Sequence, residues 1–381
     1  GEILIVEAAD YVGGRARSSQ AKEGWLADFP LELGAEFIHG ENAFTHQLLI
    51  EAGMHSSPIE RKKLMYLAVP YAASTSDKIE PRARPLSSYP INGAVSRIQQ
   101  MALLVDELGD APPMTAGNDR SLWQYFLERG VPSADYGLAN VLFAQTWCCD
   151  IAALSCRDIQ RELTVDTAGP PQVGISVGDR EFRIIPSYSA LWSWMIQAAR
   201  LDVMLSTAVR TIEWTEEGLI RARNESGVTA CTDGMQIDAR ACVLSASVGV
   251  LQASLRHFVP SLPNWKQNAI LHGFCFEPAT KLVFVFDRRL WPEDMTYLCH
   301  TGLCARWWTS SYNRPGTQTH VIMCYVTANN ARLIDSMDEV ASLQVGLTEL
   351  SNLLGQSLQT LKQHLKQSRR ISWASQVSLS S

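Results

Sequence analysis

Two charged residues stand beside apolar segments in which a charge has little reason to be. Lys281 opens the apolar run 281–286, where an ammonium group must find partners or have its pKa lowered by desolvation. The alternative interpretation is a lysine whose long stem reaches solvent from a strand end. Glu7 follows the apolar run 3–6, which favours a parallel strand buried on both faces. The carboxyl ends of such strands carry the ligand-binding groups of open α/β sheets, and a carboxylate there can accept from both hydroxyls of a nucleotide ribose.

Glycines and an arginine follow Glu7 at short spacing. Gly13 and Gly14 allow the backbone to approach a ligand closely, and Arg15 supplies a cation beside them. A surface glutamate and an ordinary glycine turn would explain each residue taken singly. The pattern E-A-x-x-x-x-G-G-R is, however, followed by L-G-A-x-x-x-x-G at 33–40. Together the two patterns indicate one ligand-binding segment.

These patterns resemble the second strand and following loops of the flavin-containing amine oxidases, which include polyamine oxidases, monoamine oxidases and lysine-specific histone demethylases. The form G-A-x-(F/W)-(I/V)-H-G is most similar to the polyamine and spermine oxidases, where a histidine occupies the place of His39. Three later segments carry the same resemblance: L-x-x-x-V-x-x-I at 205–212, V-x-x-x-S-V-G-V-L at 243–251, and Lys281 followed by F-x-x-x-x-W at 286–291.

The resemblance implies FAD-dependent oxidation of a polyamine-like amine, with hydride transfer to flavin N5 and reduction of molecular oxygen to hydrogen peroxide. Lys281 would hold a water against flavin N5, and His39 would face the substrate. The cofactor-binding residues that it implies are Glu7, Gly13, Gly14, Arg15, Gly34, Ala35 and, through its backbone near adenine, Val209. Non-covalent FAD is expected, because the cysteine that attaches FAD in monoamine oxidases belongs to a segment without a counterpart here. Trp307, Trp308 and Tyr325 could form an aromatic wall for the amine, but core packing is the stronger expectation.

The ends of the sequence suggest a shortened form of this family. A dinucleotide-binding fold places G-x-G-x-x-G about 20 residues before the acidic residue, whereas only six residues precede Glu7. A final flavin-binding F-x-G-E stretch is likewise not found after Trp373. We therefore expect weak FAD binding and exposed apolar surface on strand 3–6. A catalytically inactive remnant or binding scaffold of the same fold stays open as the alternative. An NAD-dependent dehydrogenase is a weaker hypothesis, since it has no place for the two glycine patterns.

The predicted fold is α/β: an incomplete FAD-binding dinucleotide fold with an interleaved α+β substrate-binding domain. The length of 381 residues suggests two domains. We predict FAD-binding segments at 1–60 and 181–258 and substrate-domain segments at 61–180, mainly helical, and 259–381. Strands are expected at 65–69, 182–185, 203–205, 209–214, 219–224, 241–244, 279–290, 295–298, 306–309 and 320–326. Helices are expected at 43–54, 95–108, 122–129, 136–153, 190–199 and 338–354.

Composition narrows the class of protein. With 46% hydrophobic and 19% charged residues, the chain can bury a large core. A net charge of −6 without charge blocks argues against a nucleic-acid partner, and no apolar run reaches the ~18 residues of a membrane span. The nine cysteines show no C-x-x-C spacing, so we expect buried free thiols, a reducing compartment and a cytoplasmic location. No metal-ligand spacing is visible, and no metal is predicted.

Overall fold

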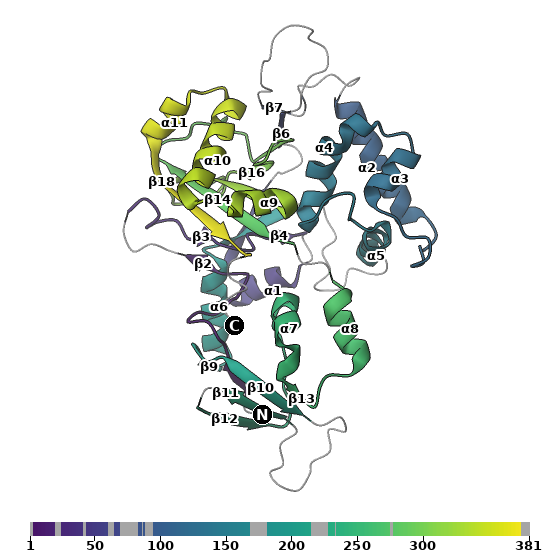
Figure 1. The fold of residues 1–381 in the computed structure, drawn as a ribbon. Coiled ribbons are helices and arrows are strands. Elements are labelled where there is room, and N and C mark those ends of the chain that lie inside the picture. The colour runs from purple at the N-terminus through teal and green to yellow at the C-terminus, as the bar shows by residue number, and fades with distance from the viewer. Residues whose placement is uncertain are drawn as a thin grey trace. The chain divides into compact units, whose positions relative to one another are not determined.

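Figure 1 shows the fold of the chain in a computed structural model. The structure describes residues 3–19, 24–40, 43–59, 65–68, 83–85, 87, 94–167, 181–214, 228–232, 234–274 and 277–374. The chain forms two compact units. Unit 1 comprises Gly1–Arg17, Trp192–Phe276 and Trp373–Ser381, and unit 2 comprises Ser18–Leu191 and Glu277–Ser372.

A seven-stranded sheet is the largest feature of unit 2, with the strand order β18-β14-β17-β16-β15-β6-β7. Its strands are β6 (Met65–Ala68), β7 (Arg84–Pro85), β14 (Ala279–Phe286), β15 (Tyr297–His300), β16 (Arg306–Trp308), β17 (His320–Thr327) and β18 (Leu365–Ser372). The strand β14 is antiparallel to both neighbours, so that Lys281 stands opposite Tyr325 on β17 and Ile371 on β18. Aromatic and β-branched residues fill these strands, as expected of a pleated surface buried by packing.

Three helices lie against this sheet: α9 (Ala328–Asp335), α10 (Glu339–Leu354) and α11 (Leu358–His364). The helix α10 begins at Asp338, whose carboxylate accepts from the Ala341 N–H, and ends at Gly355 with a φ of 64°. Gly346 permits its close approach, because a Cβ there would lie 2.9 Å from Cδ1 of Leu282. Leu282 and Phe284 are fully buried beneath the helix.

The remaining parts of unit 2 frame the segment that contains the L-G-A pattern. Its helices are α1 (Phe44–Glu51), α2 (Ala94–Asp110), α3 (Leu122–Glu128), α4 (Tyr136–Ala139) and α5 (Cys156–Thr167). Its smaller strands are β2 (Ser18–Ser19), β3 (Leu31–Glu32), β4 (Phe37–His39), β5 (His55–Ile59) and β8 (Glu181–Ile185). A two-stranded sheet β2-β3 and a three-stranded sheet β4-β8-β5 hold the segment 32–39 at both of its ends.

The described residues of unit 1 form two sheets, and three helices lie in the same segments or begin just before them. In the first sheet, β1 (Leu4–Val6) pairs in parallel with β9 (Asp202–Met204). The second sheet has the order β12-β11-β10-β13, formed by β10 (Val209–Trp214), β11 (Val228–Thr232), β12 (Gln236–Ala239) and β13 (Phe258–Val259). The helices are α6 (Tyr188–Ala198), which begins in unit 2, α7 (Val248–Ser254) and α8 (Asn264–His272).

The predicted α/β class is confirmed, and most predicted elements occur within a few residues of their expected bounds. The predicted strand 279–290 ends at Phe286. The helix expected at 136–153 is α-helical only as far as Ala139 and continues as π and 3-10 turns to Trp147. The elements that were not predicted are helices α5, α7, α8, α9 and α11 and strands β2, β3, β4, β5, β7, β11, β12, β13 and β18. The strand expected at 219–224 and the strand end at Val69 lie outside the described residues.

Two predictions about apolar runs are wrong. The run 3–6 forms the parallel strand β1, but it is not buried on both faces, since Ile3, Leu4 and Ile5 are 61%, 42% and 36% exposed. The exposed apolar surface that was also expected on this strand is confirmed. The run 241–244 forms no strand, and Val243 is 93% exposed. The reason is the same in both cases: burial of an apolar run requires neighbouring strands or helices, which composition alone does not supply.

The unit boundaries differ from the predicted domain boundaries. Residues 18–60 and 181–191 were assigned to the FAD-binding domain but lie in unit 2, where β4, β5 and β8 form one sheet. Residues 259–276 were assigned to the substrate domain and lie in unit 1. The assignment of FAD to one domain and of the substrate to the other stays a prediction.

Cys148 and Cys149 are half-buried free thiols, Cys156, Cys299, Cys304 and Cys324 are buried free thiols, and Cys242 is an exposed one. None of the helices in the described ranges combines the length and the apolarity that crossing a membrane requires.

Candidate functional site

Lys281 is buried and ties β14 to the segment that carries the L-G-A pattern. Its side chain is 4% exposed, and its Nζ donates to the carbonyl oxygens of Glu32 at 3.1 Å and Gly34 at 2.6 Å. The Glu36 Oε2 lies 3.6 Å away. Burial lowers the pKa of the Lys281 ammonium, and the Glu36 carboxylate opposes that effect only in part. The interpretation as a lysine that reaches solvent is therefore wrong, since this lysine finds its partners inside the protein.

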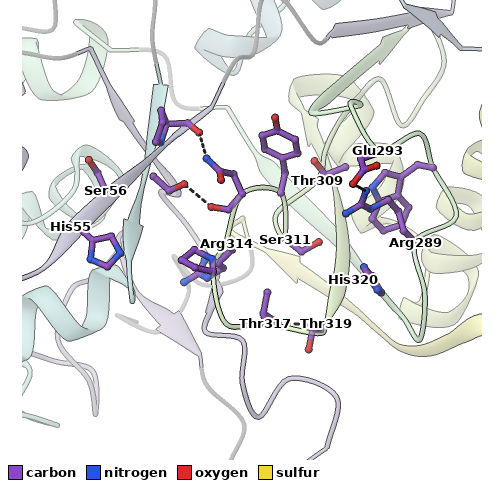
Figure 2. A pocket seen from close by; sticks show the side chains of 16 residues that line it. His55, Ser56, Arg289, Glu293, Thr309, Ser311, Arg314, Thr317, Thr319 and His320 are labelled. Atoms are coloured by element: carbon purple, nitrogen blue, oxygen red, sulfur yellow. Dashed lines mark hydrogen bonds and ion pairs between the residues drawn. The ribbon is translucent and has the colours of Figure 1, made fainter.

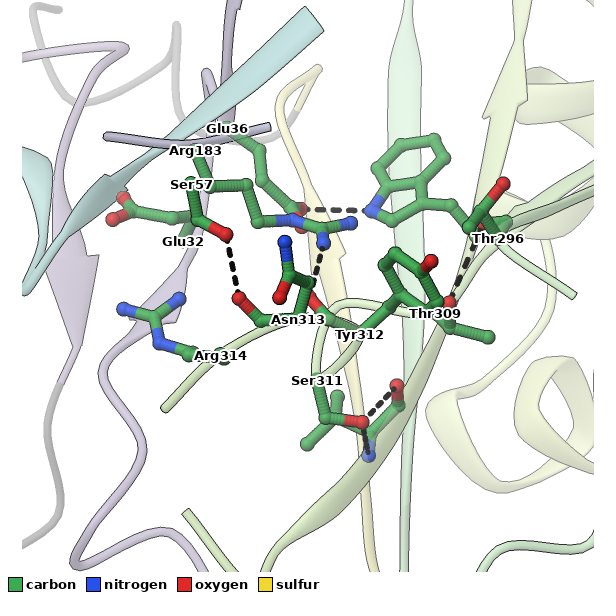
Figure 3. A network of polar contacts seen from close by, with 12 residues as sticks. Glu32, Glu36, Ser57, Arg183, Thr296, Thr309, Ser311, Tyr312, Asn313 and Arg314 are labelled. Atoms are coloured by element: carbon green, nitrogen blue, oxygen red, sulfur yellow. Dashed lines mark hydrogen bonds and ion pairs between the residues drawn. The ribbon is translucent and has the colours of Figure 1, made fainter. Parts of the chain in front are cut away.

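Glu36 is the carboxylate around which this cluster is arranged. It accepts from the Trp308 Nε1 at 2.8 Å and from the Arg183 Nε at 3.1 Å. Burial alone would raise the pKa of Glu36, but Lys281 and Arg183 outweigh burial and hold it below the usual value. Figure 3 shows Arg183 beside Glu36, with its other end donating to the carbonyl of Tyr312 at 3.1 Å. The result is a buried ion cluster of Lys281, Glu36 and Arg183.

Glu32 lies next to this cluster and behaves differently. Its Oε2 accepts from the Ser18 Oγ at 2.8 Å and its Oε1 from the Tyr188 N–H at 3.1 Å. Burial raises the pKa of Glu32 to about 7, because these two neutral donors compensate only partly for the lost hydration. Unit 2 therefore holds two buried carboxylates four positions apart with opposite titration behaviour.

The structure brings Gly34 to Lys281 but leaves His39 outside the cluster. The Gly34 carbonyl is the nearest acceptor of the ammonium group, and Ala35 is the next residue. His39 ends β4, is 61% exposed and has its Nδ1 3.3 Å from Oε1 of Glu181. Its exposure leaves the ring accessible to a ligand, and within the described residues His39 makes no contact with Lys281.

The three aromatic residues considered for an amine-binding wall are packed in the interior or close to it. Trp307 is fully buried and stacks on Phe284 with a centroid distance of 5.9 Å. Trp308 is 6% exposed and donates to Glu36, and Tyr325 packs against it at 5.8 Å. Trp307 is therefore a core residue, which was the stronger of the two expectations for these aromatic residues.

In unit 1 the backbone brings Glu7 and the start of β10 to the same end of β1. The Glu7 N–H donates to the Met204 carbonyl at 2.8 Å, and the Glu7 carbonyl accepts from the Thr207 N–H at 2.9 Å. Val209 opens β10 two residues after Thr207. Glu7 is half-buried, and its Oε1 accepts from the Ala9 N–H at 2.8 Å, while no donor to its second carboxylate oxygen occurs in the part of the chain that the structure describes.

The glycine turn of unit 1 has the geometry of a close backbone approach. Gly13 has a φ of 97°, and a Cβ there would lie 2.6 Å from Cδ1 of Trp192. Gly14 has a φ of 51° and nothing within 4 Å of the position of a Cβ, so its backbone borders open space. Arg15 is exposed beside it. An anion or a sugar could therefore approach the Gly14 backbone and the Arg15 guanidinium, which fits the nucleotide part of a flavin cofactor.

Two members of the buried cluster were not predicted. Arg183 stands in the apolar run 182–185, the same signal that identifies Lys281, and that signal could have found it. Glu36 lies inside the L-G-A pattern, where the sequence offers no indication that its partners are Arg183 and Lys281.

Comparison with known proteins identifies the family. The model of the flavin containing amine oxidoreductases matches residues 2–126 and 176–377, most of the chain. The chain therefore belongs to this flavin-containing family, and its predicted membership is confirmed.

Several of its curated relatives are polyamine oxidases. The chain is 23% identical to polyamine oxidase 3 of Oryza sativa subsp. japonica over 376 residues, covering 93% of this chain and 68% of the relative. It is 26% identical to probable polyamine oxidase 4 of Arabidopsis thaliana over 159 residues, 41% of this chain and 30% of the relative. Polyamine oxidase 1 of Zea mays is 43% identical over 68 residues, 18% of this chain and 13% of the relative. The chain thus matches less than a third of the length of two of these relatives.

Solved structures share the fold. A wild-type putrescine oxidase bound to putrescine superposes with a TM-score of 0.72 at 18% identity, covering 97% of this chain and 79% of that one. Cyclohexylamine oxidase from Brevibacterium oxydans IH-35A has a TM-score of 0.71 at 16% identity, covering 99% and 80%. At these identities the likeness establishes the fold.

Proposed function

We propose that this protein oxidises a small polyamine-like amine with non-covalently bound FAD and molecular oxygen. The observation that carries the proposal is the buried ammonium of Lys281, which lies against the Gly34 carbonyl of the family's L-G-A pattern. When bound, FAD would accept the hydride at its N5 and pass the electrons to oxygen, which gives hydrogen peroxide.

The residues of unit 1 would hold the nucleotide part of the cofactor. The free oxygen of the Glu7 carboxylate would accept from ribose hydroxyls, as carboxylates do at the carboxyl ends of parallel strands. The open backbone at Gly14 and the Arg15 cation would face the pyrophosphate, and Gly13 shapes that turn. The Val209 backbone would contact adenine. These roles fit the exposed groups of the structure and stay proposals.

In unit 2, Lys281 would hold a water molecule against flavin N5, while Gly34 and Ala35 would border the flavin ring. Its ammonium has three N–H donors, and Glu36 and the two carbonyls fix the direction of its stem. His39 would contact the substrate, since its exposed ring can donate or accept at the end of β4.

One observation favours the second candidate, a catalytically inactive protein of the same fold. The Lys281 ammonium is already surrounded by three protein acceptors: the Glu32 carbonyl, the Gly34 carbonyl and the Glu36 carboxylate. The two carbonyls accept hydrogen bonds and the Glu36 carboxylate lies 3.6 Å away, so a water would compete with this carboxylate for the third N–H of the ammonium. The distinguishing measurement is flavin content together with amine-dependent peroxide formation by the purified protein.

Replacement of Lys281 tests the catalytic role in FAD-loaded protein. Lys281→Met keeps most of the stem but removes every donor, so flavin reduction by amine should slow by about two orders of magnitude while FAD stays bound. Stopped-flow absorbance measures the reduction, and the flavin spectrum measures occupancy. Lys266→Met, at an exposed lysine of α8, is the matched control and should react like the wild type. Equal reduction rates for Lys281→Met and wild type would refute the role of Lys281.

A further inference from the structure

Unit 2 contains a cavity of about 500 Å³ that belongs neither to the Lys281 cluster nor to His39 (Figure 2). Its walls come from three segments: 55–58 on β5, 289–293 after β14, and 309–320 between β16 and β17. Its volume lies within the range of small-molecule sites, about 300–1,000 Å³.

The ionisable groups of the cavity are mainly basic. Arg289, Arg314, His55 and His320 line it, against the single carboxylate of Glu293. Figure 2 shows Arg314 and His55 on one side and Arg289 and His320 on the other. A cationic amine would meet two guanidinium groups here, so the charge of the cavity disfavours the substrate class proposed above for the flavin site.

The hydroxyl groups of the walls are already committed to protein acceptors. The Ser57 Oγ donates to the Asn313 carbonyl at 2.6 Å, and the Thr309 Oγ1 donates to the Met295 carbonyl at 3.0 Å. Thr317 and Thr319 both donate to the carboxylate of Asp28, at 3.2 and 2.6 Å, so that their hydroxyl hydrogens are committed to this neighbouring group. Recognition of a ligand is therefore left mainly to guanidinium and imidazole N–H groups.

The two arginines have different partners in the protein, and both guanidinium groups can still bind a ligand. Arg289 pairs with Glu293 at 3.2 Å, but the Glu293 side chain is 91% exposed, so that this pair contributes little and can be exchanged for a ligand. The Arg314 guanidinium lies 4.8 Å over the Phe29 ring and donates to the Pro186 carbonyl, which fixes its plane. Within the described residues, the His55 and His320 rings make no hydrogen bond.

We propose that this cavity binds a small polyanion through carboxylate or phosphate oxygens, with Arg289 and Arg314 as its anchors. Planar guanidinium groups bind such oxygens in pairs, and the two arginines on opposite sides favour a ligand that carries more than one anionic group. His55 and His320 would add further donors. The proposal does not depend on flavin or on amine oxidation.

The test uses the full chain and two probes of different chemistry, citrate and inorganic pyrophosphate, at constant ionic strength. Isothermal titration calorimetry should show saturable binding of at least one probe with a stoichiometry near one. Citrate alone would identify a carboxylate ligand, and pyrophosphate alone would identify a phosphate ligand. Spermine, a cation, should not compete.

Neighbouring arginines provide the matched control. Arg289→Gln should weaken binding at least tenfold, whereas Arg288→Gln, at the exposed neighbouring residue that does not line the cavity, should stay within twofold of wild type. Arg314→Gln should also weaken binding at least tenfold, with circular dichroism to verify its fold. Three results would overturn the proposal: no saturable binding of either probe, equal losses in the Arg288 and Arg289 variants, or displacement of the anion by spermine.

Discussion

The strands β1 and β14 are both apolar runs with an ionisable residue at one end, yet the protein treats them in opposite ways. In β14, pairing with β17 and β18 and cover by α10 bury Leu282 and Phe284 completely. In β1, β9 is the partner strand among the described residues, and Leu4 stays 42% exposed. Apolar composition selects a strand, but its neighbours decide whether it is buried.

The carboxylates of Glu36 and Glu7 differ in burial in the same way as the two strands. Glu36 is buried with two side-chain donors and the nearby Lys281 ammonium, so its charge is part of the fold of unit 2. Glu7 is half-buried and accepts from one backbone N–H, so its charge stays available to a ligand. A charge that is fully committed to internal partners stabilises structure, whereas one that is partly committed can bind.

Replacing each carboxylate by its amide gives the largest expected difference. Glu36→Gln leaves the buried Lys281 and Arg183 without their counter-ion, so the free energy of unfolding should fall by about 3–5 kcal/mol. Glu7→Gln should change it by less than about 1 kcal/mol, since the group is half solvated. Guanidinium denaturation at pH 7, followed by tryptophan fluorescence, measures both. Losses of equal size would show that the two carboxylates do not differ as the structure indicates.

Leucine truncations compare the apolar faces of the same two strands. Leu282→Ala opens a cavity under α10 and should cost about 2–5 kcal/mol of unfolding free energy. Leu4→Ala removes a side chain that is already partly hydrated and should cost less than about 1 kcal/mol. The same denaturation experiment applies, and a Leu4→Ala loss as large as that of Leu282→Ala would mean that β1 is packed in solution.

A pH titration separates Glu32 from Glu36. The folded-state pKa of Glu32 is raised from 4.5 to about 7, so the folded protein holds a proton that the unfolded chain releases in this window. The stability from this group is present below pH 4.5 and is lost as pH rises to about 7, by at most a few kcal/mol. Glu36, with its lowered pKa, contributes in the opposite sense, since its stability is lost as pH falls.

Glu32→Gln isolates the first of these effects. As pH rises from 4.5 to 7, the free energy of unfolding of the wild type should fall relative to that of the variant. Above pH 7 the difference between the two should be constant. Chemical denaturation at a series of pH values measures it. A difference that is independent of pH would contradict the raised pKa.

The sequence predicts the α/β class and the family, and it singles out Lys281 as an unusual charge in an apolar strand. These predictions depend on local patterns, namely apolar runs, glycine spacing and a single charge in an apolar run. The sequence does not predict the cluster around Lys281, since Glu36 and Arg183 meet it only through pairing of distant segments. The failure at 241–244 has the same cause, because an apolar run becomes a strand only where another strand is present to pair with it. The sequence shows which residues carry unusual chemistry, whereas the partners of those residues depend on tertiary structure.

The smallest expected effect on stability tests the exposed face of β1. Ile3, Leu4 and Ile5 present apolar side chains on a strand with one described partner, and such edges promote association between molecules. Leu4→Lys should slow aggregation at 37 °C, measured by light scattering, while changing the unfolding free energy by less than about 0.5 kcal/mol. Leu127→Lys in α3, where the leucine is 43% exposed, introduces the same charge at the same exposure on a helix. If both variants slow aggregation equally, the added charge is the cause. If Leu4→Lys acts alone, the exposed apolar face of β1 is the surface that associates.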